Sequence, residues 1–462
     1  MIKRSFFGLA KPRFVYESLD SPMKPERIPM PRKATLHFDQ PLDRRDALLL
    51  NPGDTVKTGQ KLVLTEDSDD YIISPVTGAV SSVSAFIGDF GASCTALSID
   101  VAEEEEIDSG FSEVSGDVSL ENAAQYLQHL PGNPPFKALT DPGTTIETLV
   151  VTGLDPDLLV ATHQNIVQTH VNAINRGISI LKKMTHAKYV IVALPQKLLK
   201  RAGGVGGASG TEIRVIAEDY PSALPPFIMK EVLGKVVPAG KTSTDMGVAF
   251  FTAEAVAGVT EAFDTGKIPT TKTLTVIKKD LSRMLVEARI GTPLRDIFAI
   301  CGITLNDRDR IILGGPMTGG AIYTEDYPVG PETDAVMVQD SAAVSLVSDY
   351  PCINCGECIR ICPADIPVNM LVRFCEARQY ETAADEYDLY SCIECGLCTF
   401  VCPSRIPIFQ YIRLAKYEMA KAEAEIEPVE EAPVETTEDT TAEGAEETVK
   451  ESQEETAEET DA

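Results

Sequence analysis

The chain has 462 residues, of which 44% are apolar and 24% are charged. This balance is ordinary for a soluble globular protein and excludes a chain that is disordered throughout or collagen-like. At roughly 150 residues per domain, the length predicts about three domains. No run of about 18 apolar residues occurs, which argues against an integral membrane protein and predicts no transmembrane segment.

The formal net charge of −29 is concentrated at the C-terminus, because residues 421–462 contain 17 acidic and 2 basic residues. This Glu- and Thr-rich tail cannot bury enough apolar surface to offset its chain entropy, so we expect a disordered acidic tail. The remaining body is mildly acidic. A nucleic-acid partner is not expected, because binding phosphates requires clustered Lys and Arg.

The N-terminal half is predicted to contain an arm, a β-module and a linker. Residues 1–33 are rich in proline and predict an extended arm, which either packs on its own body or touches a membrane surface or a partner through its basic, aromatic start. No apolar signal-peptide core follows Met1, so we expect a cytoplasmic location. Residues 34–102 predict short strands with glycine turns. Their segments 51–62 and 74–80 resemble the halves of a barrel-sandwich hybrid. Residues 103–119 predict an acidic linker.

The middle of the chain alternates strand and helix patterns. Short apolar runs predict strands at 148–153, 189–194, 213–217 and 246–251, and the spacing over 165–184 predicts a helix. Such alternation over 120–266 is typical of a parallel sheet. Residues 267–345 predict a small α+β module, with strands at 274–277 and 310–316 and a helix at 293–302. Residues 346–420 predict a helical, cysteine-bearing domain.

The pattern that carries chemistry is a pair of cysteine runs. Residues 352–363 read CINCGECIRICP, and residues 392–403 read CIECGLCTFVCP with the same spacing. This is the spacing of bacterial ferredoxins with two 4Fe-4S clusters, in which the fourth cysteine of each run ligates the other cluster. The expected ligand sets are Cys352, Cys355, Cys358 and Cys402 for one cluster, and Cys392, Cys395, Cys398 and Cys362 for the other.

Zinc is the alternative metal, but structural zinc sites usually use separated pairs of cysteines rather than three in one loop. Cys94, Cys301 and Cys375 lie outside the runs, and we expect packed thiols there. The five histidines form no predicted metal set. The glycine-rich segment 203–210 does not match a phosphate-binding motif and predicts a flexible surface loop.

Three further segments carry a family resemblance. The sequences RIGTPLRD at 289–296, ILGGPMTG at 312–319 and IPIFQYIRLAK at 406–416, together with the cysteine runs, resemble the RnfC family of the Rnf ion-translocating electron-transport complex. The resemblance spans about residues 34–420 and is strongest over 289–420. It implies a fold like the flavin subunit of respiratory complex I for 120–266 and a β-grasp module of the soluble-ligand-binding (SLBB) type for 267–345.

The resemblance also implies a function. The family is an oxidoreductase and translocase subunit, peripheral on the cytoplasmic face of the cell membrane, with two 4Fe-4S clusters and usually FMN and an NADH site. Its expected partners are the membrane subunits of an Rnf-like complex and ferredoxin or another redox carrier. No catalytic residue is predicted.

The chain departs from the family around the flavin. The family's glycine-rich flavin loop corresponds here to residues 130–137, LPGNPPFK, and its acidic strand-end motif to residues 152–158, TGLDPDL. The remaining candidates for FMN or NADH binding are Gly132, Gly153, Asp155 and Asp157. A later polar pair is replaced by Phe251 and Thr252. Lost glycines and added prolines remove backbone donors that a phosphate needs.

We therefore predict an electron-transfer subunit whose FMN/NADH site is degenerate. Three alternatives stay open at this point: a subunit that uses NADH and FMN normally, a soluble ferredoxin-like adaptor of another oxidoreductase, and a scaffold in which the clusters are structural.

Overall fold

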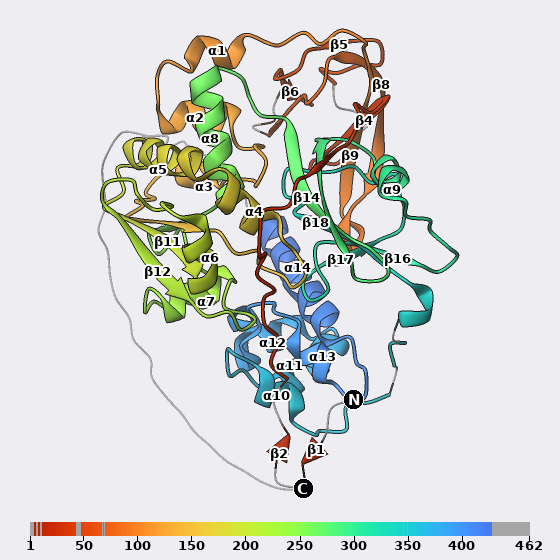
Figure 1. Ribbon diagram of the computed structural model, residues 1–462. Coiled ribbons are helices and arrows are strands. Elements are labelled where there is room, and N and C mark those ends of the chain that lie inside the picture. Colours follow the sequence, from red (N-terminus) through yellow and green to blue (C-terminus); the bar gives the residue numbers. More distant parts are fainter. Residues whose placement is uncertain are drawn as a thin grey trace, which may run out of the picture. The chain divides into compact units, whose positions relative to one another are not determined.

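The computed structural model describes residues 4–5, 8–9, 12–42, 48–66, 68, 70–344, 346–348 and 350–426 (Figure 1). The chain divides into two units, residues 1–419 and 420–462. The first unit contains the sheets and all but the end of the last helix. Of the second unit, only residues 420–426, which continue helix α14, fall within the described residues.

The N-terminal arm packs on the body over its described part. Two-residue strands β1 (Arg4–Ser5) and β2 (Gly8–Leu9) pair with each other, and β3 (Glu26–Arg27) adds to the edge of a sheet along β15 (Arg283–Arg289). Tyr16 and Leu19 are buried. The arm from residue 12 onward thus contacts the body, whereas Lys3, Phe6, Phe7 and Lys11 of its basic, aromatic start lie outside the described residues, so both interpretations of that start stay predictions.

The β-module consists of antiparallel strands. A four-stranded sheet has the order β4 (Lys33–Phe38), β9 (Ser93–Val101), β8 (Gly78–Ile87) and β5 (Thr55–Val56), and β6 (Lys61–Val63) pairs with β7 (Tyr71–Ile73). A 3₁₀ turn, η1 (Asp89–Gly91), joins β8 to β9. Alternate residues of β4 are buried, as a strand with one covered face requires. The barrel-sandwich interpretation of this module stays a prediction.

The segment predicted as an acidic linker needs a correction. Residues 110–114 form helix α1 (Gly110–Val114), and its Phe111 is only 2% exposed. Phe111 packs in the same core as the following α/β region, where it contacts the ring of Phe263. Phe111 thus holds the segment 103–119, which is otherwise acidic, against the α/β region.

The predicted parallel sheet is confirmed. It has the order β12 (Thr211–Ile216), β11 (Tyr189–Pro195), β10 (Thr148–Thr152) and β13 (Val248–Thr252), and every neighbouring pair is parallel. The helix predicted over 165–184 is instead two helices, α4 (Thr162–Thr169) and α5 (Val171–Thr185), which meet at the non-helical His170. The remaining helices are α2 (Leu120–Tyr126), α3 (Phe136–Leu139), α6 (Gln196–Ala202), α7 (Pro225–Glu231) and α8 (Ala253–Thr265).

The two faces of this sheet bury different partners. Leu149 and Val151 of β10 belong to a core with α4, α5 and α8, whereas Val150 between them belongs to a second core. Residues of the cysteine-bearing region, including Cys395 and Leu397, lie in that second core with Tyr16 and Tyr220. One face of the sheet therefore supports the segment that carries the second cysteine run.

A mixed sheet follows in the chain. Its order is β17 (Gly320–Ile322), β16 (Arg310–Leu313), β18 (Ala335–Gln339), β14 (Thr271–Ile277), β15 and β3, and helix α9 (Leu294–Cys301) packs against it (Figure 1). The predicted strands and helix of this region are confirmed. A 3₁₀ turn, η2 (Ser341–Ala343), leads out of it.

The cysteine-bearing region is helical, with α10 (Glu357–Ile361), α11 (Val368–Glu376), α12 (Tyr380–Tyr387), the 3₁₀ turn η3 (Leu389–Ser391), α13 (Leu397–Val401) and α14 (Ile408–Ile426). Helix α14 continues six residues into the segment predicted to be disordered from 421, because its pattern of Ala and Glu favours helix. The rest of that tail, 427–462, lies outside the described residues. No helix in the described ranges is long and apolar enough to cross a membrane.

Candidate functional site

The two cysteine runs have the same backbone conformation. In each run a residue with positive φ lies between the first two cysteines, Asn354 in one run and Glu394 in the other, both with φ of 55°. Gly356 and Gly396, with φ of 72° and 69°, then precede helices α10 and α13. The third cysteine of each run lies in the helix and the fourth follows its end. The repeat in sequence is thus a repeat in structure.

The structure groups the cysteines across the two runs. A small cavity is lined by Cys352, Cys355 and Cys358 of the first run together with Cys402 of the second. In the other group, burial raises the pKa of Cys395 to about 12, and the thiols of Cys392 and Cys362 raise it as well. Burial also raises the pKa of Cys398, again with contributions from Cys392, Cys395 and Cys362.

This grouping suits a metal cluster chemically. Four thiols converge in each group, three from one run and one from the other. None of the eleven cysteines is in a disulfide. A buried thiol with a raised pKa gives up its proton when a cation takes the proton's place, and thiolates are the ligands of iron–sulfur clusters. The residues present therefore fit two cubane clusters.

The second run is fixed to the body by backbone contacts. The hydroxyl of Tyr220 donates a 2.7 Å hydrogen bond to the carbonyl oxygen of Cys395, and Tyr220 packs against Tyr16 with ring centroids 5.6 Å apart. Gly396 faces the backbone carbonyl of Met317 so closely that a Cβ atom could not fit. The first run is more open, because Cys355 is exposed and Ile353 is 65% exposed.

Asp157, a predicted cofactor residue, is instead a structural clamp. Its carboxylate accepts hydrogen bonds from the backbone N–H of Met317 at 3.1 Å and from the N–H and hydroxyl of Thr318, each at 2.7 Å. Burial raises the pKa of Asp157, and these hydrogen bonds oppose the rise. Asp157 therefore fixes the turn at 314–319, and the carbonyl of Met317 in this turn contacts Gly396.

Asp155 and Gly153 also make their contacts inside the protein. Asp155 is fully buried, and its two carboxylate oxygens accept the backbone N–H groups of His163 at 2.8 Å and Gln164 at 3.3 Å. These are unpaired donors in the first turn of α4, so Asp155 caps that helix. Gly153 leaves no room for a Cβ because the side chains of Leu194 and Val167 fill the space.

The loop around Gly132 uses backbone donors within the protein that a phosphate would need. The N–H of Gly132 donates to Pro331 O at 2.8 Å, that of Asn133 donates to Leu130 O at 2.8 Å, and Pro131, Pro134 and Pro135 have none. Gly132 packs against Thr252 and Ala255 at the start of α8, where Thr252 caps the helix through Ala255 N. This is the carboxyl edge of the parallel sheet, where such folds bind ligands. The residues present do not fit FMN.

A buried charge network that sequence patterns did not indicate lies near this edge. Lys272 and His163 are 0% and 1% exposed at their side chains, and both pair with Asp334, at 2.6 Å and 3.0 Å. Lys272 also pairs with buried Glu254, in the first turn of α8. The four residues come from four separate elements, so no local spacing could have revealed them.

Burial alone would lower the pKa of His163, but the charge and hydrogen bond of Asp334, with a smaller effect of Asp155, raise it to about 9. Burial raises the pKa of Glu254, and the charge of Lys272 opposes the rise. Each carboxylate and ammonium is hydrogen-bonded, as burial requires. His163 Nδ1 is buried without a partner among the described residues.

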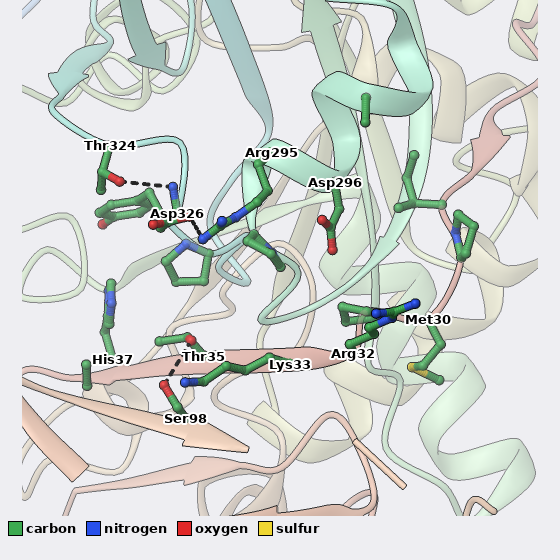
Figure 2. A pocket seen from close by; sticks show the side chains of 18 of the residues that line it. Met30, Arg32, Lys33, Thr35, His37, Ser98, Arg295, Asp296, Thr324 and Asp326 are labelled. Atoms are coloured by element: carbon green, nitrogen blue, oxygen red, sulfur yellow. Dashed lines mark hydrogen bonds and ion pairs between the residues drawn. The ribbon is translucent and has the colours of Figure 1, made fainter. Parts of the chain in front are cut away.

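A cavity of about 760 Å³ is lined by the end of the N-terminal arm, the β-module and the mixed sheet (Figure 2). Arm residues Met30, Arg32 and Lys33 line it together with β4, β9, α9 and the loop at 324–328. Figure 2 shows Arg295 turned toward Asp326, with which it forms an ion pair, and Thr35 beside Ser98, 3.2 Å apart between hydroxyls. No cysteine of either run lines this cavity.

Comparison with known proteins agrees with the cysteine geometry. Residues 351–406 match a family described as a 4Fe-4S dicluster domain. The chain is 24% identical over 396 residues to the RnfC protein of the ion-translocating oxidoreductase complex of Pectobacterium carotovorum subsp. carotovorum, covering 82% of this chain and 53% of the relative. It is 26% identical over 392 residues to the protein of the same name from Cronobacter sakazakii, covering 81% and 50%.

The chain thus spans about half the length of the curated relatives it matches. Among solved structures, an NAD⁺-reducing [NiFe]-hydrogenase in the H₂-reduced state shares 14% identity, with a TM-score of 0.43 and coverage of 69% of each chain. The resemblance predicted from the sequence is confirmed, and the low identity agrees with a divergent chain.

Proposed function

Because this chain is a divergent relative of the RnfC proteins of ion-translocating oxidoreductase complexes, we propose that it is an electron-transfer subunit of such a complex. Single electrons pass through two 4Fe-4S clusters. One cluster is held by Cys352, Cys355, Cys358 and Cys402, and the other by Cys392, Cys395, Cys398 and Cys362. The observation that carries the proposal is the convergence of three cysteines from one run with the fourth of the other.

The clusters, when bound, supply one-electron transfer, and the protein's residues position them. Tyr220 and the turn at 314–319 fix the second cysteine run against the parallel sheet. With all four corners of each cubane ligated, no position is left open for a substrate. We therefore place no acid–base or nucleophilic chemistry at these sites.

We further propose that FMN and NADH do not bind at the sheet edge. The backbone donors of Gly132 and Asn133 are bound within the protein, and Asp155 and Asp157 accept backbone N–H groups of the protein itself. Electrons then enter and leave this chain through its clusters. The expected partners are the membrane subunits of the complex on the cytoplasmic face, and ferredoxin or another redox carrier.

Chemical analysis of anaerobically purified protein tests this function. We expect about eight iron and eight acid-labile sulfide per chain, an EPR signal after reduction with dithionite, and no stoichiometric flavin. The variant Cys398→Ser should lose one cluster, whereas Cys375→Ser, which changes a buried cysteine outside both runs, should keep both. Zinc without sulfide would overturn the redox function, and stoichiometric FMN bleached by NADH would overturn the relay without flavin.

The crossed ligand sets have their own test. Cys362→Ser and Cys398→Ser should remove the same EPR signal, and Cys402→Ser should remove the other. If Cys362→Ser instead removed the same signal as Cys358→Ser, each run would hold its own cluster and the proposed sets would be wrong.

A further inference from the structure

A groove of about 500 Å³ opens beside the second cysteine run. One wall consists of residues 390–394, including Cys392 and Ile393, with Pro363 of the first run. The other wall consists of α7 and the loop at 236–243. Cys392, a proposed ligand of the second cluster, therefore lines this groove.

Part of the groove lining is apolar. Phe227 and Val237 are partly buried and join the core that also contains Cys395, and Val236 is 71% exposed. Pro225, Pro226 and Pro238 add further apolar surface. A partner that covers the exposed Val236 gains free energy from removing its apolar surface from water, and no hydrogen bond is lost.

The charged groups of the groove are mainly basic. Lys230, Lys241, Lys416 and Glu394 are the charged residues that line it. Glu394 is already paired with Lys416 at 2.8 Å, and Lys416 also donates to Cys392 O at 2.8 Å. In the part of the chain that the structure describes, Lys230 and Lys241 form no ion pair. The groove thus carries positive charge on a body whose net charge is negative.

We propose that this groove docks an acidic electron-carrier protein, which exchanges one electron with the second cluster. The inference rests on the proposed function. Apolar side chains together with unpaired lysines are what a partner of opposite charge can bury and pair with, and complementary charge speeds encounter. Redox complexes are commonly transient and have small interfaces. In the exchange the carrier loses one electron and the cluster gains it, with no bond formed or broken.

The surface of the first run differs in charge. Glu357 is the charged residue that lines the small cavity of the first cysteine group, and Arg360 pairs with it at 2.6 Å, so this lining carries no positive charge. The charge pattern therefore selects the second run for an acidic partner.

Stopped-flow kinetics with the cluster-loaded full chain tests the proposal. The probe is a reduced bacterial two-cluster ferredoxin of acidic pI, mixed anaerobically at low ionic strength. The double variant Lys230→Glu/Lys241→Glu should lower the second-order rate constant at least tenfold and abolish its decrease with added salt. Lys183→Glu, an exposed lysine on α5 outside the groove, should leave the rate within twofold of the unmodified protein.

A second variant tests the apolar part of the groove lining. Val236→Asp places a like charge against the acidic carrier at an exposed position, so folding should be unaffected and the rate constant should fall. Dithionite reduction followed by EPR distinguishes a failure of the docking site from a failure of the proposed function. If all variants keep reducible clusters but the double variant matches Lys183→Glu, or if no carrier-driven reduction occurs at all, the docking site is wrong. If the unmodified protein has no reducible cluster, the proposed function itself is wrong.

Discussion

At the scale of single residues, two glycines at equivalent positions of the cysteine runs have different surroundings. Gly356 and Gly396 both have positive φ, which side chains adopt at a cost. A Cβ on Gly356 would meet only the guanidinium end of Arg360, at 3.3 Å, whereas a Cβ on Gly396 would collide with the carbonyl of Met317. Substituting each glycine in turn therefore distinguishes the cost of positive φ, which both share, from the cost of the contact with Met317, which only Gly396 makes.

We expect Gly396→Ala to destabilise the protein more than Gly356→Ala does. Both variants carry the strain of positive φ, about 1 kcal/mol, and Gly396→Ala must also push the second run away from residue 317 at a further cost of about 1–3 kcal/mol. Anaerobic thermal unfolding and the EPR signal of each cluster measure the difference. Equal destabilisation by the two substitutions would contradict a tight contact between the second run and the turn.

At the scale of elements, the charge network joins α4, α8, β14 and the residue before β18. The protonation of His163 in this network depends on whether the protein is folded. Because the pKa of His163 is about 9 instead of its ordinary 6.5, the folded state binds this proton more tightly than the unfolded state does. The resulting stabilisation is complete below pH 6.5 and is lost as the pH rises through 9.

We therefore expect the unmodified protein to lose stability between pH 6.5 and 9.5 by about 3 kcal/mol more than the variant His163→Gln does. Thermal unfolding of both proteins at several pH values measures the difference. His186→Asn is the matched control, since His186 is an exposed histidine with positive φ that asparagine tolerates. Parallel pH profiles for the unmodified protein and His163→Gln would contradict a charged His163.

The elements also show what sequence reasoning could find. Short apolar runs predicted the parallel strands; those of β10 and β11 are buried, because a strand in the middle of such a sheet is covered on both faces, whereas β12 at the edge is largely exposed. The spacing of the cysteines predicted the two runs as metal-binding loops, because three cysteines at short, fixed intervals have few other uses. The crossed ligand sets stay a prediction. The break at His170 and the anchoring of Phe111 were missed, since both depend on tertiary packing. The pairing of His163 with Asp334, 171 residues away, leaves no local pattern. Asp155 and Asp157 were found, but as cofactor candidates rather than as clamps.

At the scale of the whole unit 1–419, the cysteine region has a core of its own and shares a second core with the parallel sheet. Leu371, Leu389 and Ile412 belong to the first of these, against which cysteines of both runs pack. The core on the other face of the sheet contains no described residue of the cysteine region. The region should thus depend on its metal far more than the sheet does.

Removal of iron tests this division. After anaerobic chelation we expect the amides of residues 352–415 to lose protection from hydrogen exchange, while those of β10 and β11 keep it. Reconstitution with iron and sulfide should restore protection. Loss of protection throughout the sheet on chelation would show that the two cores unfold together.

The loop at 130–137 also constrains how this chain can change over evolution. The N–H groups of Gly132 and Asn133 are bound to Pro331 and Leu130, three of the eight positions are proline, and Gly132 packs against the start of α8. A phosphate-binding loop would require several substitutions here at once, because a single substitution would break an existing contact without freeing the other donors. Sequence change is therefore easier at the surface of this protein than at this edge of the sheet.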